Sequence, residues 1–462
     1  MRPTQDNIYE TFINNPIGRD IDVILFSQMI NQLDRSFSIS LDSRWGSGKT
    51  FFVKQTKMVL DAYNDHIDGD LENDKKIAVK KIVDEKLSAL GRTIEFEPQV
   101  TVYFDAWEND YLDDPLLSLV YEILENVHSD FEFNDEKNVV SIVASIFECA
   151  TSRNAKGIID ALRSDNPLDE IKKQKNLHSL VSDFLESVLS EHGNRLVIFV
   201  DELDRCKPSY AVQLLERVKH YFDNSRITFV FSMNSEALQH TICNYYGHNF
   251  DATRYLERFF DLSMSLTPIN NEQFCDFIGA MRTSSVFDET RRDVIEKYDF
   301  EMRDILRYYM ITSVEADKPA HSRDWRETPE NLAWYFSLVY VIPIATALRM
   351  TSITKYEDFI YGRSNADALI EILEKKYDSF FCQSLLMNDE SYEEEKRTET
   401  KPVKLSDKLT LVYEALFQYQ YSGSDHCVYI GACKFTRRVR DWVLYTLSAL
   451  SNNADYDFVQ SE

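Results

Sequence analysis

The sequence carries the stretch Ser43-Arg44-Trp45-Gly46-Ser47-Gly48-Lys49-Thr50 between an alternating apolar and polar segment at 37–41 and a run without helix breakers at 51–60. The alternation is typical of a strand, and the run is long enough for a helix. A strand, a glycine-rich turn and a helix that begins at Lys-Thr form the setting of a phosphate-binding loop. Glycines let backbone N–H groups converge on an anion, and the helix N-terminus adds a favourable dipole.

The residues of this loop have separate expected roles. Lys49 is predicted to contact the β- and γ-phosphates, and the hydroxyl of Thr50 is predicted to bind Mg²⁺. The loop pattern G-x-x-x-x-G-K-[ST] has Ser43 at its first glycine, and serine costs more than glycine if that position needs a positive φ. The alternative is a Gly/Ser turn that binds nothing. The nucleotide contacts are expected from Trp45, Gly46, Ser47, Gly48, Lys49 and Thr50.

A second motif lies at residues 195–205, which read RLVIFVDELDR. An unbroken apolar run that ends in two carboxylates indicates a buried parallel strand with its acids at the carboxyl edge of a sheet, where ligands of open α/β sheets bind. Asp201 is predicted to hold Mg²⁺ through water, and Glu202 is predicted to orient and polarise the attacking water. A solvated loop is the alternative for such a pair, but the phosphate loop upstream favours the catalytic interpretation.

These motifs together resemble the KAP-type P-loop NTPases, a branch of the STAND/AAA-like ATPases. The resemblance covers roughly residues 17–310 and has two departures, Ser43 and Asp105, where the family often has Gly and Asn. It implies an α/β fold with a parallel sheet sandwiched by helices, and an ATPase that uses ATP and Mg²⁺. The matching segments are 45–50 (WGSGKT), 103–107 (YFDAW) followed by 114–116 (DPL), 201–206 (DELDRC) and 255–258 (YLER).

Other site residues follow from position in this resemblance. Asn234 ends a buried strand and is expected either to sense the γ-phosphate or to cap the helix after it. Arg258, with Arg254 as second candidate, is expected to act as an arginine finger in a neighbouring subunit, or else to pair with Glu257 or Asp261. Arg303 or Arg307 resembles a lid arginine that touches the nucleotide, with a plain surface arginine as the alternative.

The expected domain organisation has four parts. Residues 1–268 form the P-loop core, with a helical insert near 112–190 that accounts for the long spacing between Lys49 and Asp201. Residues 269–388 form a helical lid or C-terminal region, and 389–404, poor in apolar residues, form a linker. Residues 405–462 close the chain with helices around a turn at 422–424, so the C-terminal region is expected to be all-α.

Composition bears on the expected partners and on the cellular setting. The 462 residues carry a net charge of −26, so a nucleic-acid partner is not indicated by charge, although Lys434, Arg437, Arg438 and Arg440 form a local basic cluster. Seven cysteines without C-x-x-C or Cys/His spacing favour a reduced, cytoplasmic setting. Residues 332–348 are apolar but interrupted by Pro343, which favours a buried helix pair or a partner surface over a membrane span.

The sequence therefore predicts Mg²⁺-dependent hydrolysis of ATP that drives association or a shape change. A homo-oligomer and a protein partner or effector are expected, and membrane association is not. The resemblance suggests a bacterial defence role, such as blocking phage growth. Two alternatives stay open: a nucleotide-gated scaffold with little hydrolysis, and a membrane-associated signalling NTPase that uses residues 332–348.

Overall fold

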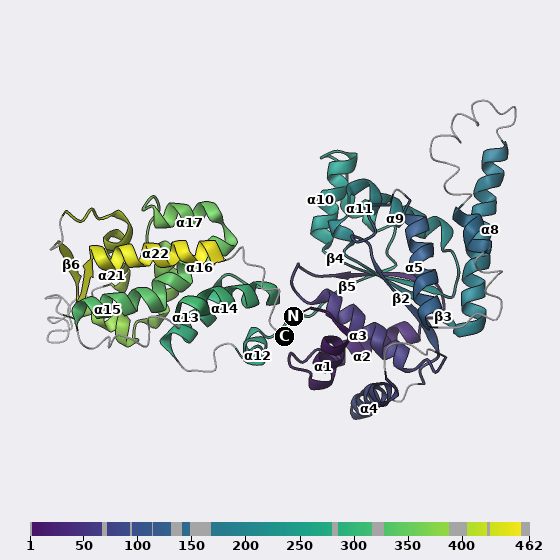
Figure 1. Ribbon diagram of the computed structural model, residues 1–462, viewed down its shortest axis with the longest axis horizontal. Helices are drawn as coiled ribbons and strands as arrows, with labels where there is room; N and C mark the ends of the chain where they lie inside the picture. Colours follow the sequence, from purple (N-terminus) through teal and green to yellow (C-terminus); the bar gives the residue numbers. More distant parts are fainter. Residues whose placement is uncertain are drawn as a thin grey trace. The chain divides into compact units, whose positions relative to one another are not determined.

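The computed structural model divides the chain into two units, Met1–Ile269 and Asn270–Glu462, each described here by itself (Figure 1). The boundary expected from sequence was 268. Of the predicted linker at 389–404 only Lys404 is among the described residues, and of the turn at 422–424 only Ser422. The structure describes residues 2–66, 72–92, 95–112, 114–130, 141–147, 168–279, 285–316, 328–387, 404–422 and 426–453.

Unit 1 is built on a five-stranded parallel sheet in the order β2-β3-β4-β1-β5. Because every strand runs in the same direction, the carboxyl ends of all five meet at one edge. In the register of the two motif strands, Asp105 lies opposite Asp201. The strands are β1 (Phe37–Asp42), β2 (Gln99–Asp105), β3 (Arg195–Asp201), β4 (Ile227–Met233) and β5 (Leu262–Ser265).

Helices cover both faces of this sheet, as the apolar run of β3 predicts. Leu196, Ile198 and Val200 pack into one hydrophobic cluster, and Val197 and Phe199 pack into the other. Each fully buried side chain of this size contributes roughly 1.5–3 kcal/mol. The second cluster includes side chains of α1 (Gln5–Asn14), α2 (Asp20–Asn31), α3 (Lys49–Ala62) and α4 (Asn73–Ala89), the purple and blue helices of Figure 1.

The opposite face of the sheet carries the described part of the predicted insert. Leu116, Leu119 and Val181 belong to the first cluster, together with every second residue of β3. The described helices of the insert therefore form a layer of the core and not a separate subdomain. Residues 113, 131–140 and 148–167 of the insert lie outside the described residues. The helices of this layer are α5 (Pro115–Asp130), α8 (Leu168–His192), α9 (Pro208–Tyr221), α10 (Ser235–Tyr246) and α11 (Ala252–Leu256).

Unit 2 contains the apolar segment at residues 332–348. Pro329–Thr351 is the one helix among the described residues that is long and apolar enough to cross a membrane, and 89% of its most apolar window is buried inside the protein. The expected helix pair is instead one helix, because a π turn, η2 (Ser337–Val341), joins α15 (Pro329–Phe336) to α16 (Ile342–Thr351). Its Ile342 N to Ser337 O bond stands directly before Pro343, which lacks an N–H.

Four of the other described helices pack against this one: α13 (Val286–Lys297), α14 (Met302–Ala316), α17 (Ile353–Ile360) and α22 (Arg437–Asn453). The remaining described helical segments of unit 2 are α12 (Asn271–Phe277), α18 (Asp367–Leu373), the 3₁₀ turn η3 (Glu374–Lys376), α19 (Phe380–Leu386), α21 (Leu405–Tyr413) and the π turn η4 (Glu414–Gln418).

The C-terminal region is not all-α, contrary to the sequence prediction. An antiparallel hairpin, β6 (Cys427–Ile430) and β7 (Cys433–Thr436), precedes α22. The turn between the strands needs glycine, since Gly431 has φ +57° and a Cβ there would meet the backbone oxygens of Ser384 and Leu385. The short β-prone segments were overlooked because they are flanked by longer helical patterns.

Candidate functional site

The phosphate loop connects β1 to α3 at the carboxyl edge of the sheet. Gly46 has φ +90° and Gly48 has φ +89°, conformations that suit glycine, whereas Ser43 does not have a positive φ. Serine at the first position of the pattern therefore carries no backbone strain. Within the described chain, the N–H groups of Gly46, Gly48 and Thr50 donate to no other residue, so these donors are open to an anion.

Lys49 begins α3 and lies largely buried beneath the loop. Its Nζ donates to the carbonyl oxygens of Ser43, at 2.5 Å, and Arg44, at 2.9 Å. Burial lowers the pKa of Lys49, and the surrounding carboxylates, Asp204 first, oppose that shift. The ammonium is therefore held against the loop that would receive phosphates.

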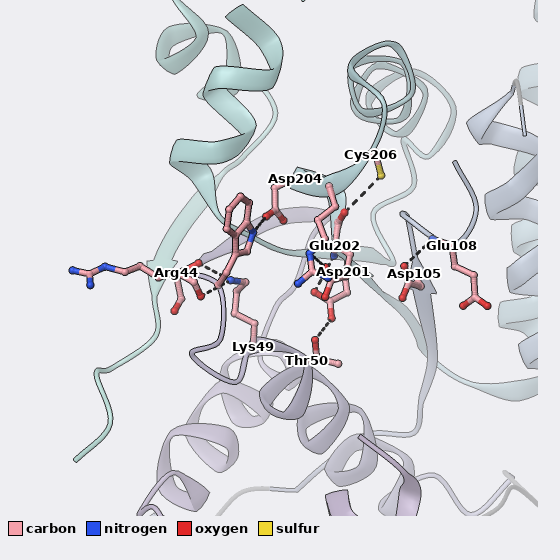
Figure 2. A network of polar contacts seen from close by, with 12 residues as sticks. Arg44, Lys49, Thr50, Asp105, Glu108, Asp201, Glu202, Asp204 and Cys206 are labelled. Atoms are coloured by element: carbon pink, nitrogen blue, oxygen red, sulfur yellow. Dashed lines mark hydrogen bonds and ion pairs between the residues drawn. The ribbon is translucent and has the colours of Figure 1, made fainter. Parts of the chain in front are cut away.

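Thr50 and Asp201 meet although they are 151 positions apart in the chain. The Thr50 hydroxyl donates to Oδ2 of Asp201 at 2.7 Å (Figure 2). The hydroxyl of Tyr103 donates to the same oxygen at 3.0 Å. No group of three or more His, Cys, Asp or Glu suited to a metal occurs among the described residues. A hydroxyl with one carboxylate fits Mg²⁺, which keeps several waters and shares substrate phosphates.

Glu202 follows Asp201 in a backbone conformation that is rare for a residue with a side chain, φ +62°. Its carboxylate pairs with the guanidinium of Arg205, one turn along the short helix η1 (Leu203–Arg205). Burial, followed by repulsion from Asp201, raises the pKa of Glu202 to about 7, and Arg205 acts in the opposite direction. A carboxylate with such a pKa is suited to accept a proton from water near neutral pH.

The segment after β3 also contacts the phosphate loop. The indole N–H of Trp45 donates to Oδ2 of Asp204 at 2.5 Å, although Trp45 is 50% exposed. Asp105, whose role was open, ends β2 and accepts from the N–H of Glu108 at 3.0 Å. Sequence reasoning assigned no role to Tyr103, Asp204 or Arg205, although all three lie inside the motifs that it quoted.

Asn234 caps a helix, one of the two roles expected for it. Its side-chain oxygen accepts from the N–H of Ala237, at 3.1 Å, at the start of α10. The preceding strand ends beside the phosphate loop, since the N–H of Ser43 donates to the carbonyl of Met233. The cap occupies the oxygen of the amide and not its NH₂ group.

The candidate arginines are exposed. Within the described chain, neither Arg254 nor Arg258 pairs with Glu257 or Asp261, and the Asp261 carboxylate accepts from the N–H of Ser38. The ion-pair alternative for Arg258 is therefore not observed. Arg303 and Arg307 lie on exposed positions of α14 in unit 2.

The residues of this site lie within a match to a known protein family. A model of the KAP family P-loop domain matches residues 23–327. An uncharacterized protein of Methanocaldococcus jannaschii is 34% identical over 67 residues, which are 14% of this chain and 34% of that relative. The solved structure of the ORC2 protein of Aeropyrum pernix, in ADPNP–ADP complexes, is 11% identical to this chain. The alignment covers 94% of this chain and 95% of that one, with a TM-score of only 0.27.

The family match takes in the whole of the site described above. It includes the phosphate loop, the Asp105 strand, the Asp201–Glu202 pair and Asn234. Nucleotide binding at the phosphate loop follows from this match. Because the match covers more than half of the chain, this protein belongs to the KAP family of P-loop NTPases.

Proposed function

We propose that the protein is a Mg²⁺-dependent ATPase that cleaves the β–γ bond. The observation that carries the proposal is the 2.7 Å contact between Thr50 and Asp201, with Glu202 next in the chain. It brings the two expected Mg²⁺ ligands and the expected base to one place from two distant motifs. Thr50 and Asp201 would hold Mg²⁺ there, and the ion would supply positive charge to offset that of the phosphates.

The residues of the chain have distinct parts in this reaction. The open N–H groups of the loop bind phosphate oxygens, and Lys49 leaves the carbonyls of Ser43 and Arg44 to contact the β- and γ-phosphates. Glu202 orients a water for in-line attack and accepts its proton. The amide NH₂ group of Asn234 can donate to the γ-phosphate while its oxygen continues to cap α10.

Steady-state hydrolysis of ATP and GTP by the purified chain, with EDTA as the metal-free control, tests this function. We expect turnover that Lys49→Ala and Glu202→Gln both abolish. Glu202→Gln should keep nucleotide affinity, because glutamine keeps the size of the side chain and Glu202 is not among the residues expected to bind the nucleotide. Tight binding without turnover in the wild type would contradict hydrolysis and support the nucleotide-gated scaffold.

We further propose that the active form is a homo-oligomer in which Arg258 acts on a neighbouring copy. The exposed side chain of Arg258, without an ion pair among the described residues, supports this proposal. Specific activity should then rise with protein concentration in the wild type and not in Arg258→Ala, with mass photometry on the same samples. Activity that is independent of concentration would contradict it.

The cellular setting that we propose is cytoplasmic defence against phage, together with a protein effector. Family resemblance supports this role, and the chain carries no second catalytic motif that sequence analysis found. Plaque assays with cells that express the wild type or Lys49→Ala test it, and equal plaque numbers would contradict it.

A further inference from the structure

The side chain of Arg205 lies between the expected base and an exposed aromatic ring. It follows the Asp201–Glu202 pair on η1, and its guanidinium Nε pairs with Oε2 of Glu202. The same guanidinium carbon lies 5.6 Å from the ring centre of Trp107, on the loop after β2. Arg205 thus joins the ends of the two neighbouring strands β2 and β3.

This arrangement differs from an ordinary surface ion pair. The side chains of Glu202 and Arg205 are only 17% and 26% exposed, so water screens their attraction less than at the surface. A guanidinium over an indole ring gains a further cation–π attraction. Trp107 therefore restricts the positions that Arg205 can take, and Arg205 restricts those of Glu202.

The backbone alone does not fix the Glu202 carboxylate. Glu202 stands in a left-handed conformation, and the carboxylates of Asp105, Asp201 and Asp204 repel it. A base must be held within hydrogen-bond reach of its water, and a third group commonly orients it. Arg205 is the cation among the described residues that forms an ion pair with Glu202.

We propose that Arg205, supported by the ring of Trp107, is a positioning residue that holds the carboxylate of Glu202 where it can orient the attacking water. The proposal rests on the ATPase function proposed above. Arg205 does not touch the nucleotide in this scheme, so its loss affects turnover and not nucleotide affinity. Partners that orient a reacting group in this way typically account for about ten- to a hundredfold in activity.

The test measures kcat for ATP and the Kd of a fluorescent ATP analogue in four variants. Arg205→Ala should lower kcat about ten- to a hundredfold and leave Kd within about twofold. Arg205→Lys should recover most of that loss, because it restores the opposite charge beside Glu202. Trp107→Leu should give an intermediate kcat. Arg226→Ala is the matched control, since it breaks an exposed pair with Glu186 before β4, and should leave both values unchanged.

Each other outcome is decisive. A kcat for Arg205→Ala equal to or above that of the wild type overturns the proposal, as does a loss of affinity as large as the loss of kcat. If Arg205→Ala does not fold, Trp107→Leu decides, and a wild-type kcat in that variant overturns the proposal. A wild type without turnover overturns the ATPase function itself, and this inference with it.

Discussion

The two ends of the sheet of unit 1 both carry charged side chains, but they use them differently. At the amino end, buried Arg195 begins β3 and donates to the carbonyl of Arg35, at 2.6 Å, and to the hydroxyl of Thr228, at 3.2 Å. At the carboxyl end of the same strand, Asp201 and Glu202 stand among further carboxylates that repel them. At the amino end, Arg195 makes these hydrogen bonds within the fold, although its buried Nε has no partner in the described chain. The carboxyl end has negative charge that a bound cation would offset.

This difference shows how a charged group in a functional site can be distinguished from one that serves only the fold. Burying a charge is costly, and hydrogen bonds to backbone and hydroxyl groups reduce that cost within the fold. Burial, followed by repulsion from crowded carboxylates, raises the pKa of Glu202, and the phosphate loop has N–H groups that donate to nothing in the described chain. Such crowding costs stability, and functional sites are where proteins commonly accept that cost.

The largest effect is expected at the carboxyl end. Asp201→Asn keeps the shape of the side chain and its contact with Thr50 but removes the charge that we propose to hold Mg²⁺, so kcat should fall about 10²–10³-fold. A Mg²⁺ titration of ATP hydrolysis measures this loss. Turnover within tenfold of the wild type would contradict the assignment of Asp201 as a metal ligand.

The corresponding change at the amino end should affect stability instead. Arg195→Met leaves the carbonyl of Arg35 and the hydroxyl of Thr228 without their donor, which should lower the free energy of unfolding by about 1–3 kcal/mol. Urea denaturation measures it, and kcat of the folded variant should stay within about twofold of the wild type. An unchanged urea midpoint would mean that the two ends do not differ as described.

The raised pKa of Glu202 predicts a stability that depends on pH. Between its ordinary value of 4.5 and about 7, the folded protein binds more protons than the unfolded chain, so the free energy of unfolding falls as the pH rises through this range. Glu202→Gln does not show this fall in the free energy of unfolding, because glutamine does not titrate. The Tm of the variant minus that of the wild type, in EDTA without nucleotide, should increase from pH 5 to pH 8. A difference that is constant with pH would show that Glu202 is not perturbed.

The smallest effect concerns the contact between the phosphate loop and η1. Trp45→Phe removes the donor to Asp204 and keeps the ring, so the free energy of unfolding should fall by about 0.5–1.5 kcal/mol. The matched control is Trp107→Phe, because the indole N–H of Trp107 makes no hydrogen bond within the described chain. Urea curves that coincide for the two variants would mean that the Trp45 contact adds nothing.

Much of the sheet could be predicted because its signals are local. The apolar run before Asp201 and the buried strand expected to end at Asn234 correspond to β3 and β4, which end at Asp201 and Met233. Such signals are visible in any short window, because each is an apolar run followed by polar groups. Lys49, Thr50, Asp201 and Glu202 were proposed as site residues from similar local patterns. The contacts of Asp204 and Arg205 could not be predicted, because their partners Trp45 and Trp107 lie about a hundred or more positions away in the chain.

The left-handed backbone of Glu202 affects which substitutions evolution favours at this position. A glycine at that position would relieve a conformational cost of about 1–2 kcal/mol, so selection for stability alone favours its loss. Selection for catalysis opposes that exchange, since glycine has no carboxylate. A relative with glycine at this position would therefore have a higher free energy of unfolding and would lack the proposed hydrolysis. Laboratory evolution for heat resistance should reach the same substitution early.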